Sequence, residues 1–177
     1  MFKKQFFGAL AAVCLLAVPR MIWASGSTGA TVSITGTVDG FAEWASATPA
    51  ILAADWDGHI TAVDTPQTVT KALTLYTNID VTITPTAGAH SGILTNGAQT
   101  LLTNYKLTGS VDSPDAAYKA AGTGAGQFFN VTNTYALTHV PGTGSYTVNL
   151  VVQMQSQTGV APDAGNYTAG VVLTAAW

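Results

Sequence analysis

The final stretch of the chain, "APDAGNYTAGVVLTAAW" (161–177), decides how the remaining sequence is interpreted. Its apolar and aromatic residues occupy every second position: Tyr167, Ala169, Val171, Leu173, Ala175 and Trp177. A period of two is typical of a β-strand that has one apolar face. The stretch therefore predicts a strand that continues to the last residue and needs a neighbour to cover its apolar face.

The same alternation recurs elsewhere, notably over residues 32–38 and 146–154. Turn sequences such as "DWDG" (55–58) and "PGTG" (141–144) separate these segments at distances that suit short antiparallel strands. An all-β sandwich is predicted, because several strands must each bury one face against a second sheet. The segment "SPDAAYKAAG" (113–122) is compatible with one or two helical turns in a crossover.

The first residues predict a secretory signal peptide. Lys3 and Lys4 precede an apolar run from residue 6 to residue 18, and small residues follow around Ala24. We expect cleavage after Ala24, so that residues 1–24 are removed. The single cysteine, Cys14, lies in this segment, and the rest of the chain must be stabilised by a packed core without disulfides.

The predicted mature chain has a negative net charge. Only Lys71, Lys106 and Lys119 remain against nine acidic residues, which gives a net charge of −6. Nucleic acids and anionic membrane surfaces are poor partners for such a protein, because their phosphates would repel it. The sequence therefore predicts no nucleic-acid partner.

No constellation of residues predicts catalysis, a cofactor or a bound metal. His59, His90 and His139 lie singly in turn-like segments, without a second histidine or a cysteine at ligand spacing. Asp55 and Asp57 begin an Asp-x-Asp-Gly pattern, but the glutamate that closes a calcium loop is missing. We therefore expect that the protein is not an enzyme, with no catalytic, cofactor-binding or metal-binding residues.

The aromatic residues of the chain have two interpretations. They can line a sugar-binding face, or they can pack in the core and in strand pairs, and several occupy the apolar phase of their strands. Core packing explains most of them. The residues concerned are Trp44, Trp56, Tyr76, Tyr105, Tyr118, Phe128, Phe129 and Tyr135.

Both ends of the chain resemble one family of fimbrial subunits. "GVAPDAGNYTAGVVLTAAW" (159–177) is similar to the carboxyl-terminal strand of subunits from the alpha, or alternate, chaperone-usher class, typified by colonisation factor antigen fimbriae. "TVSITGTVDGFAEW" (31–44) is similar to their opening strand, and the lack of cysteine agrees with that class. The chain departs from the pattern at Trp177, where the family has a small or aliphatic residue.

The resemblance implies an immunoglobulin-like antiparallel β-sandwich that is incomplete and is completed by a donor strand from a neighbouring subunit. It divides the chain into a signal peptide (1–24), a donor strand extension (25–39) and a pilin body (40–177). The implied donor residues are Val32, Ile34, Gly36 and Val38. The implied edge of the acceptor groove consists of Tyr167, Ala169, Val171, Leu173 and Trp177.

The function implied by the resemblance is that of a structural pilin subunit in a surface fimbria used for adhesion. Its implied partners are copies of itself, a periplasmic chaperone and an outer-membrane usher, and the implied route is export through the periplasm to the cell surface. Two alternatives remain open. The terminal Trp177 also fits a small eight-stranded outer-membrane β-barrel, and the composition fits a secreted carbohydrate-binding β-sandwich.

Overall fold

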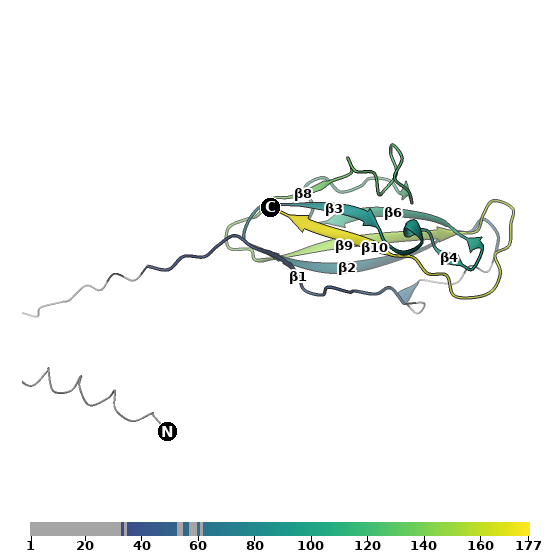
Figure 1. Cartoon of the computed structure of the whole chain (residues 1–177), viewed down its shortest axis with the longest axis horizontal. Coiled ribbons are helices and arrows are strands. Elements are labelled where there is room, and N and C mark those ends of the chain that lie inside the picture. The colour runs from purple at the N-terminus through teal and green to yellow at the C-terminus, as the bar shows by residue number, and fades with distance from the viewer. Residues whose placement is uncertain (1–32, 34, 53–54, 57–59, 61) are drawn as a thin grey trace, which may run out of the picture. The chain divides into compact units, whose positions relative to one another are not determined.

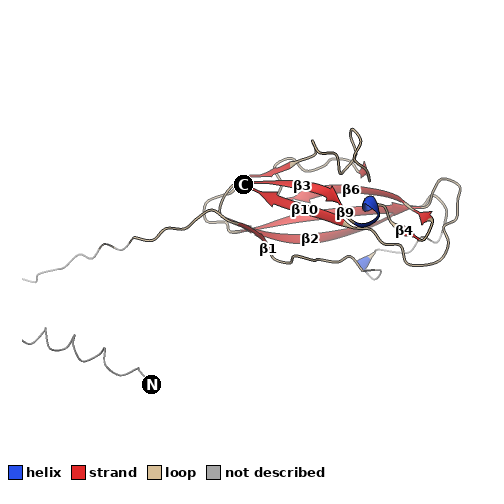
Figure 2. Ribbon diagram, in the orientation of Figure 1, coloured by secondary structure: helices blue, strands red, loops and turns tan. Residues whose placement is uncertain are grey.

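The computed structural model describes residues 33, 35–52, 55–56, 60 and 62–177, and antiparallel strands dominate this part of the chain (Figures 1 and 2). The longer strands carry the alternation or the β-branched content seen in the sequence. The strands are β1 (Ala42–Trp44), β2 (Gln67–Thr77), β3 (Val81–Ala87), β4 (Thr95–Asn96), β5 (Gln99–Thr100), β6 (Leu102–Gly109), β7 (Lys119–Ala120), β8 (Tyr135–Leu137), β9 (Ser145–Gln155) and β10 (Val171–Ala176).

The strands form two main sheets and one small one. The larger sheet has five strands in the order β1-β2-β9-β6-β7, and the second has three strands in the order β10-β3-β8. Strands β4 and β5 pair with each other alone. A short 3-10 turn, η2 (Ala89–Gly92), follows β3. Figure 1 shows β3 and β10 side by side, as their register from Val171↔Ala87 to Ala176↔Thr82 requires.

The described residues form one hydrophobic core, to which both main sheets contribute. On β9 the buried side chains Tyr146, Val148, Leu150 and Val152 follow the phase that the sequence predicted, and Val151 on the opposite face is buried as well. The three-stranded sheet contributes buried side chains to the same cluster, namely Val81, Ile83, Tyr135 and Leu137. The prediction of an all-β protein built from antiparallel sheets is confirmed.

Strands β1 and β10 each occupy the end of a sheet. Within the described residues β1 pairs only with β2, in the register Ala42↔Thr77 to Trp44↔Leu75. Strand β10 pairs only with β3 in that same part of the chain. Each therefore presents one edge without a ladder partner.

Two local features differ from the sequence-based expectations. Strand β10 begins at Val171 instead of Tyr167, because Thr168 forms an isolated bridge with Thr95 before the chain reaches β3. The helical turns considered for residues 113–122 are wrong, since β7 in this segment pairs with β6 through Asn104↔Ala120. The crossover is held by strand pairing and polar side chains.

The chain divides into two units between Thr37 and Val38, and the larger unit consists of Val38–Trp177. The predicted signal peptide, residues 1–24, and two of the predicted donor residues, Val32 and Ile34, lie outside the described residues. In the part of the chain that the structure describes, no helix has the length and apolar character needed to span a membrane.

Candidate functional site: a groove beside the last strand

A groove of about 1390 Å³ separates β10 from the inner face of the five-stranded sheet. Its floor includes Leu73 on β2 and Leu150 and Val152 on β9, so the core is open to it. Its other wall includes Val171 and Leu173 on β10. Small-molecule pockets typically have volumes of about 300 to 1,000 Å³. This groove is larger and follows the free edge of a strand.

The predicted groove-edge residues fall into two sets. Tyr167, Ala169, Val171 and Leu173 line the groove. Of these, Val171 and Leu173 are half-buried and pack against the core, as the alternation requires. Trp177 does not line the groove, and 66% of its surface is exposed. The pairing of β10 ends at Ala176↔Thr82, so Trp177 lies beyond the last ladder position, beside a smaller hollow.

The predicted donor residues are described only in part. Val38 is 81% exposed, so its apolar side chain is largely uncovered by the described residues. A Cβ added at Gly36 would meet no described atom within 4 Å. The assignment of Gly36 and Val38 as donor residues therefore stays a prediction.

Two polar groups in the groove were not recognised from the sequence. Lys71 lies on β2 in the same inward phase as Val69 and Leu73, and its Nζ is 3.9 Å from a carboxylate oxygen of Asp55. The Nε1 atom of Trp44 is buried and has no hydrogen-bond partner among the described residues. The alternation of 69–75 contained the signal for Lys71, since a lysine replaces an apolar residue at an inward position.

Where the chain enters β1, the Asn78 side chain binds the backbone on both sides of Gly40. Phe41 N–H donates to Asn78 Oδ1 at 2.8 Å, and Asn78 Nδ2 donates to the Asp39 carbonyl at 2.9 Å. The Phe41 carbonyl accepts from Thr77 Oγ1 at 2.9 Å and from Asn78 N–H at 3.4 Å. These bonds extend the β1–β2 ladder beyond the end of β1.

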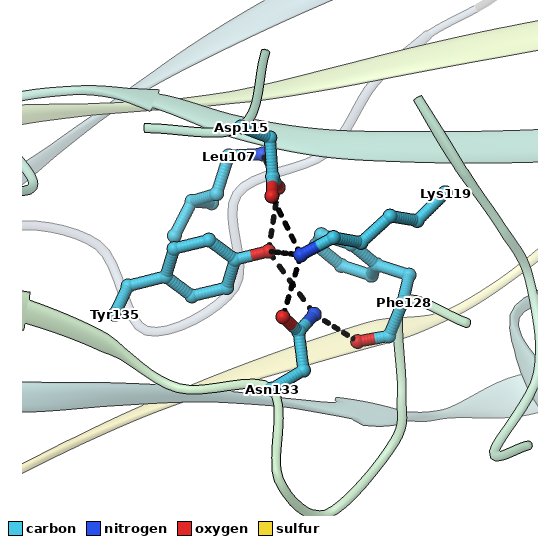
Figure 3. A network of polar contacts seen from close by, with 6 residues as sticks. All are labelled: Leu107, Asp115, Lys119, Phe128, Asn133 and Tyr135. Atoms are coloured by element: carbon cyan, nitrogen blue, oxygen red, sulfur yellow. Dashed lines mark hydrogen bonds and ion pairs between the residues drawn. The ribbon is translucent and has the colours of Figure 1, made fainter. Parts of the chain in front are cut away.

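A second cluster of polar side chains lies on the crossover between β6 and β8 (Figure 3). Lys119 Nζ is 2.6 Å from Asp115 Oδ1 and also donates to Asn133 Oδ1 at 2.6 Å. Tyr135 OH and Leu107 N–H both donate to Asp115 Oδ2, at 2.5 and 2.9 Å. The Asp115 side chain is only 6% exposed.

This cluster has a structural role. Asn133 Nδ2 donates to the Phe128 carbonyl at 2.7 Å, so the amide is bonded at both ends. Burial raises the pKa of the Tyr135 phenol above its usual range, and the hydrogen bond to Asp115 raises it further. The phenol, the carboxylate and the ammonium form hydrogen bonds and an ion pair with one another. Such a network is typical of polar groups that hold separate strands together. No sequence motif indicates this cluster, since its members lie on three separate segments.

Those candidate metal ligands that the structure describes do not come together. Asp57 and His59 lie outside the described residues. In the remaining, described part of the chain no group of three histidine, cysteine or acidic residues is arranged to hold a metal. His139 Nδ1 lies 3.0 Å from Tyr146 OH, and His90 lies in the turn η2.

Four of the eight aromatic residues considered for sugar binding are buried in the core, and Trp44 and Trp56 are partly buried against it. Tyr105 stacks on Phe128 with ring centroids 5.1 Å apart, and Phe129 packs against both. Tyr135 completes the cluster at 6.4 Å from Phe128. Tyr105 OH donates to the Gly92 carbonyl, and its burial raises the pKa of the phenol above its usual range.

Comparison of the chain with protein-family models found no match, and comparison with curated proteins found none either.

Proposed function

We propose that this protein is the structural subunit of a surface fibre, and that a strand from another copy completes each subunit. The observation that carries the proposal is the groove beside β10, which has the hydrophobic core as its floor and a free strand edge as its wall. An immunoglobulin-like sandwich that lacks one strand has this form. The donated strand is residues 25–39, whose apolar phase includes Val32, Ile34 and Val38.

The energetics of such an exchange are favourable. Burial of Val32, Ile34 and Val38 contributes about 5 to 8 kcal/mol by the usual transfer free energies. Backbone hydrogen bonds to the free edge of β10 add to this. Gly36 contributes no apolar area, and its position fits either a shallow point in the groove or a bulge in the strand.

The strand directions support an open fibre. Strand β10 ends opposite Thr82 and β1 begins opposite Thr77, so the chain enters the body at the end where β10 finishes. A donated strand antiparallel to β10 would place the donor body at the opposite end of the acceptor. Subunits would then repeat head to tail without closing. A parallel strand would bring two entry points together and favour closed pairs.

Before assembly, the subunit needs protection of its groove. Before exchange, each subunit has an apolar groove and an unpaired strand edge that would aggregate if left exposed to water. In this route a periplasmic chaperone covers the groove, which prevents aggregation. An outer-membrane usher then orders the subunits. The finished fibre lies at the cell surface, where it serves attachment.

Deletion and restoration of the donor strand test the proposal. The mature protein without residues 25–39 is expected to be an aggregation-prone monomer with a lowered melting temperature. A copy of "TVSITGTVDG" (31–40) appended after Trp177 through a flexible linker is expected to restore a soluble monomer, because the strand is then held at high effective concentration. Size-exclusion chromatography and thermal melting measure both effects.

Two substitutions within the appended copy provide the matched control. A change equivalent to Ile34→Asp is expected to abolish the rescue, because it forces a carboxylate into an apolar groove. A change equivalent to Thr35→Asp lies on the opposite face of the strand and is expected to preserve it. If the deleted protein is as stable and monomeric as the full mature chain, residues 25–39 are not a donor strand and the proposal fails.

A further inference from the structure

The polar cluster on the crossover between β6 and β8 brings an amine, a carboxamide and a carboxylate into contact (Figure 3). Lys119 Nζ donates to Asn133 Oδ1 at 2.6 Å and lies 2.6 Å from Asp115 Oδ1. Because a C=O bond is about 1.23 Å long, Nζ is no more than about 3.8 Å from Cγ, the amide carbon of Asn133. This separation is close to the value of about 3 to 3.5 Å at which positioned groups react.

The surroundings of the cluster hold these three groups in place and exclude most of the solvent. The side chains of Asp115 and Lys119 are 6% and 28% exposed, and Phe128 and Tyr135 beside them are buried. Asn133 Nδ2 donates to the Phe128 carbonyl at 2.7 Å, which fixes the amide with its oxygen toward Lys119. A lysine becomes a nucleophile when it gives up a proton, and the adjacent carboxylate is a proton acceptor within hydrogen-bond reach.

We propose that Lys119 and Asn133 form an isopeptide bond, a covalent amide between their side chains, and that Asp115 promotes the reaction as the proton acceptor. The geometry of the cluster carries this inference, which does not depend on the proposed fibre function.

The reaction follows from the contacts of the three groups. The Lys119 ammonium transfers a proton to Asp115, and the resulting amine attacks Cγ of Asn133. The Nζ–Cγ bond forms and the Cγ–Nδ2 bond breaks. Tyr135 OH donates to Asp115 Oδ2 and lies 3.0 Å from Nδ2, so it relays a proton from Asp115 to the leaving nitrogen.

Atoms and charges balance without a further reactant. Nζ loses two protons: one reaches Nδ2, which leaves as ammonia, and the other converts this ammonia to ammonium. Nζ keeps one hydrogen in the new amide, and no atom changes its oxidation state. The raised pKa of Tyr135 keeps the phenol protonated, as the relay requires.

The position of the bond gives it a structural consequence. Lys119 is in β7, which ends the five-stranded sheet away from β1, and Asn133 precedes β8, which ends the three-stranded sheet away from β10. The bond would therefore join the two sheets covalently on the side opposite the groove. Since the predicted mature chain lacks cysteine, this bond would provide the cross-link that a disulfide provides in many exported proteins.

Mass spectrometry of the mature wild-type protein tests the inference. The intact mass is expected to be lower than the mass of the sequence by one ammonia molecule. Denatured protein is expected to resist trypsin after Lys119, whose amine is blocked. No lysine or arginine follows Lys119, so residues 107–177 would remain one fragment. Chymotryptic cleavage of this fragment after Phe129 is expected to leave its two parts joined.

Three variants remove one reacting group each. Lys119→Arg keeps a cation beside Asp115 but has no amine that can attack, and Asn133→Ala has no amide. Asp115→Asn removes the proton acceptor. All three are expected to have the full mass of their sequences. Lys106→Arg is the matched control, because Lys106 lies over the ring of Tyr118, and this variant is expected to lose ammonia as the wild type does.

A wild type that has the full mass of its sequence and is cleaved after Lys119 overturns the inference. Loss of ammonia that persists in Lys119→Arg also overturns it, because Asn133 would then have cyclised on its own backbone. A cross-link that persists in Asp115→Asn overturns the role of Asp115.

Discussion

The carboxylate of Asp115 and the ammonium of Lys119 lie 2.6 Å apart, although neither residue is on a helix. Residues four positions apart meet readily on a helical surface. In this protein the pairing of Lys119 in β7 with Tyr105 in β6 brings them together instead. The pair therefore joins the crossover to the five-stranded sheet, and Tyr135 of β8 joins the same cluster.

Removal of one member of this pair is expected to be costly. Asp115→Ala leaves the Lys119 ammonium and the Leu107 N–H without the carboxylate that both use. We expect a loss of about 3 to 5 kcal/mol in the free energy of unfolding, measured by urea denaturation. Asp163→Ala, an exposed carboxylate in a loop, is expected to change it by less than about 0.5 kcal/mol. Equal effects would contradict a structural role for the cluster.

The two buried tyrosines predict a loss of stability at alkaline pH. The pKa of Tyr105 and of Tyr135 is raised in the folded state, mainly by burial. Above about pH 10 the unfolded chain releases these protons while the folded chain retains them, so stability falls by about 1.4 kcal/mol per pH unit for each phenol. Below that pH their contribution is complete. Urea midpoints from about pH 8 to about pH 11 measure the effect, and Tyr105→Phe should reduce the slope.

Gly92 is expected to tolerate no side chain. A Cβ there would overlap the ring of Phe129, and the residue has a φ of +74°. Gly92→Ala is expected to lower the free energy of unfolding by more than about 2 kcal/mol, because strain and overpacking add. Gly97 has a φ of +59° with open space around it. Gly97→Ala should therefore cost only the strain, about 1 kcal/mol. Similar melting temperatures for the two variants would contradict this packing.

Opposite faces of β10 are expected to behave differently in assembly. Leu173 lines the groove, whereas its neighbour Thr174 is exposed and does not line it. Leu173→Asp is expected to abolish polymer formation, because it places a carboxylate where the donated strand would pack. Thr174→Asp should leave polymer formation unchanged in the same sedimentation assay. Loss of polymer in both variants would indicate a general defect of the strand.

The strands with regular alternation were predicted well from the sequence. The predicted segment 146–154 lies within β9, and its apolar phase is the buried one. Strand β10 was predicted to start too early, since Tyr167 and Thr168 alternate correctly but Thr168 bridges Thr95. Periodicity identifies the face of a strand that is buried, but the neighbours that start and end a ladder come from distant parts of the chain.

Only one wall of the candidate groove could be predicted from the sequence. The alternation of 167–177 indicated the residues of β10 that face the groove, but Trp177 follows the same alternation and lies outside it. The opposite wall and the floor, including Lys71 and Trp44, depend on the packing of one sheet against the other. The Asn78 contacts were invisible for the same reason, since they join residues 37 and 39 positions apart.

The short ladder of β1 has a mechanical consequence for a fibre of the proposed kind. Tension along the fibre would enter each body at Phe41 and pass through β1, which has three register pairs with β2, whereas β2 has ten with β9. Because the pull is parallel to β1, its ladder and the Asn78 contacts would be loaded in shear together. Strand β1 is thus the part expected to yield first under load, and its detachment would lengthen the fibre while the sheets behind it remain folded.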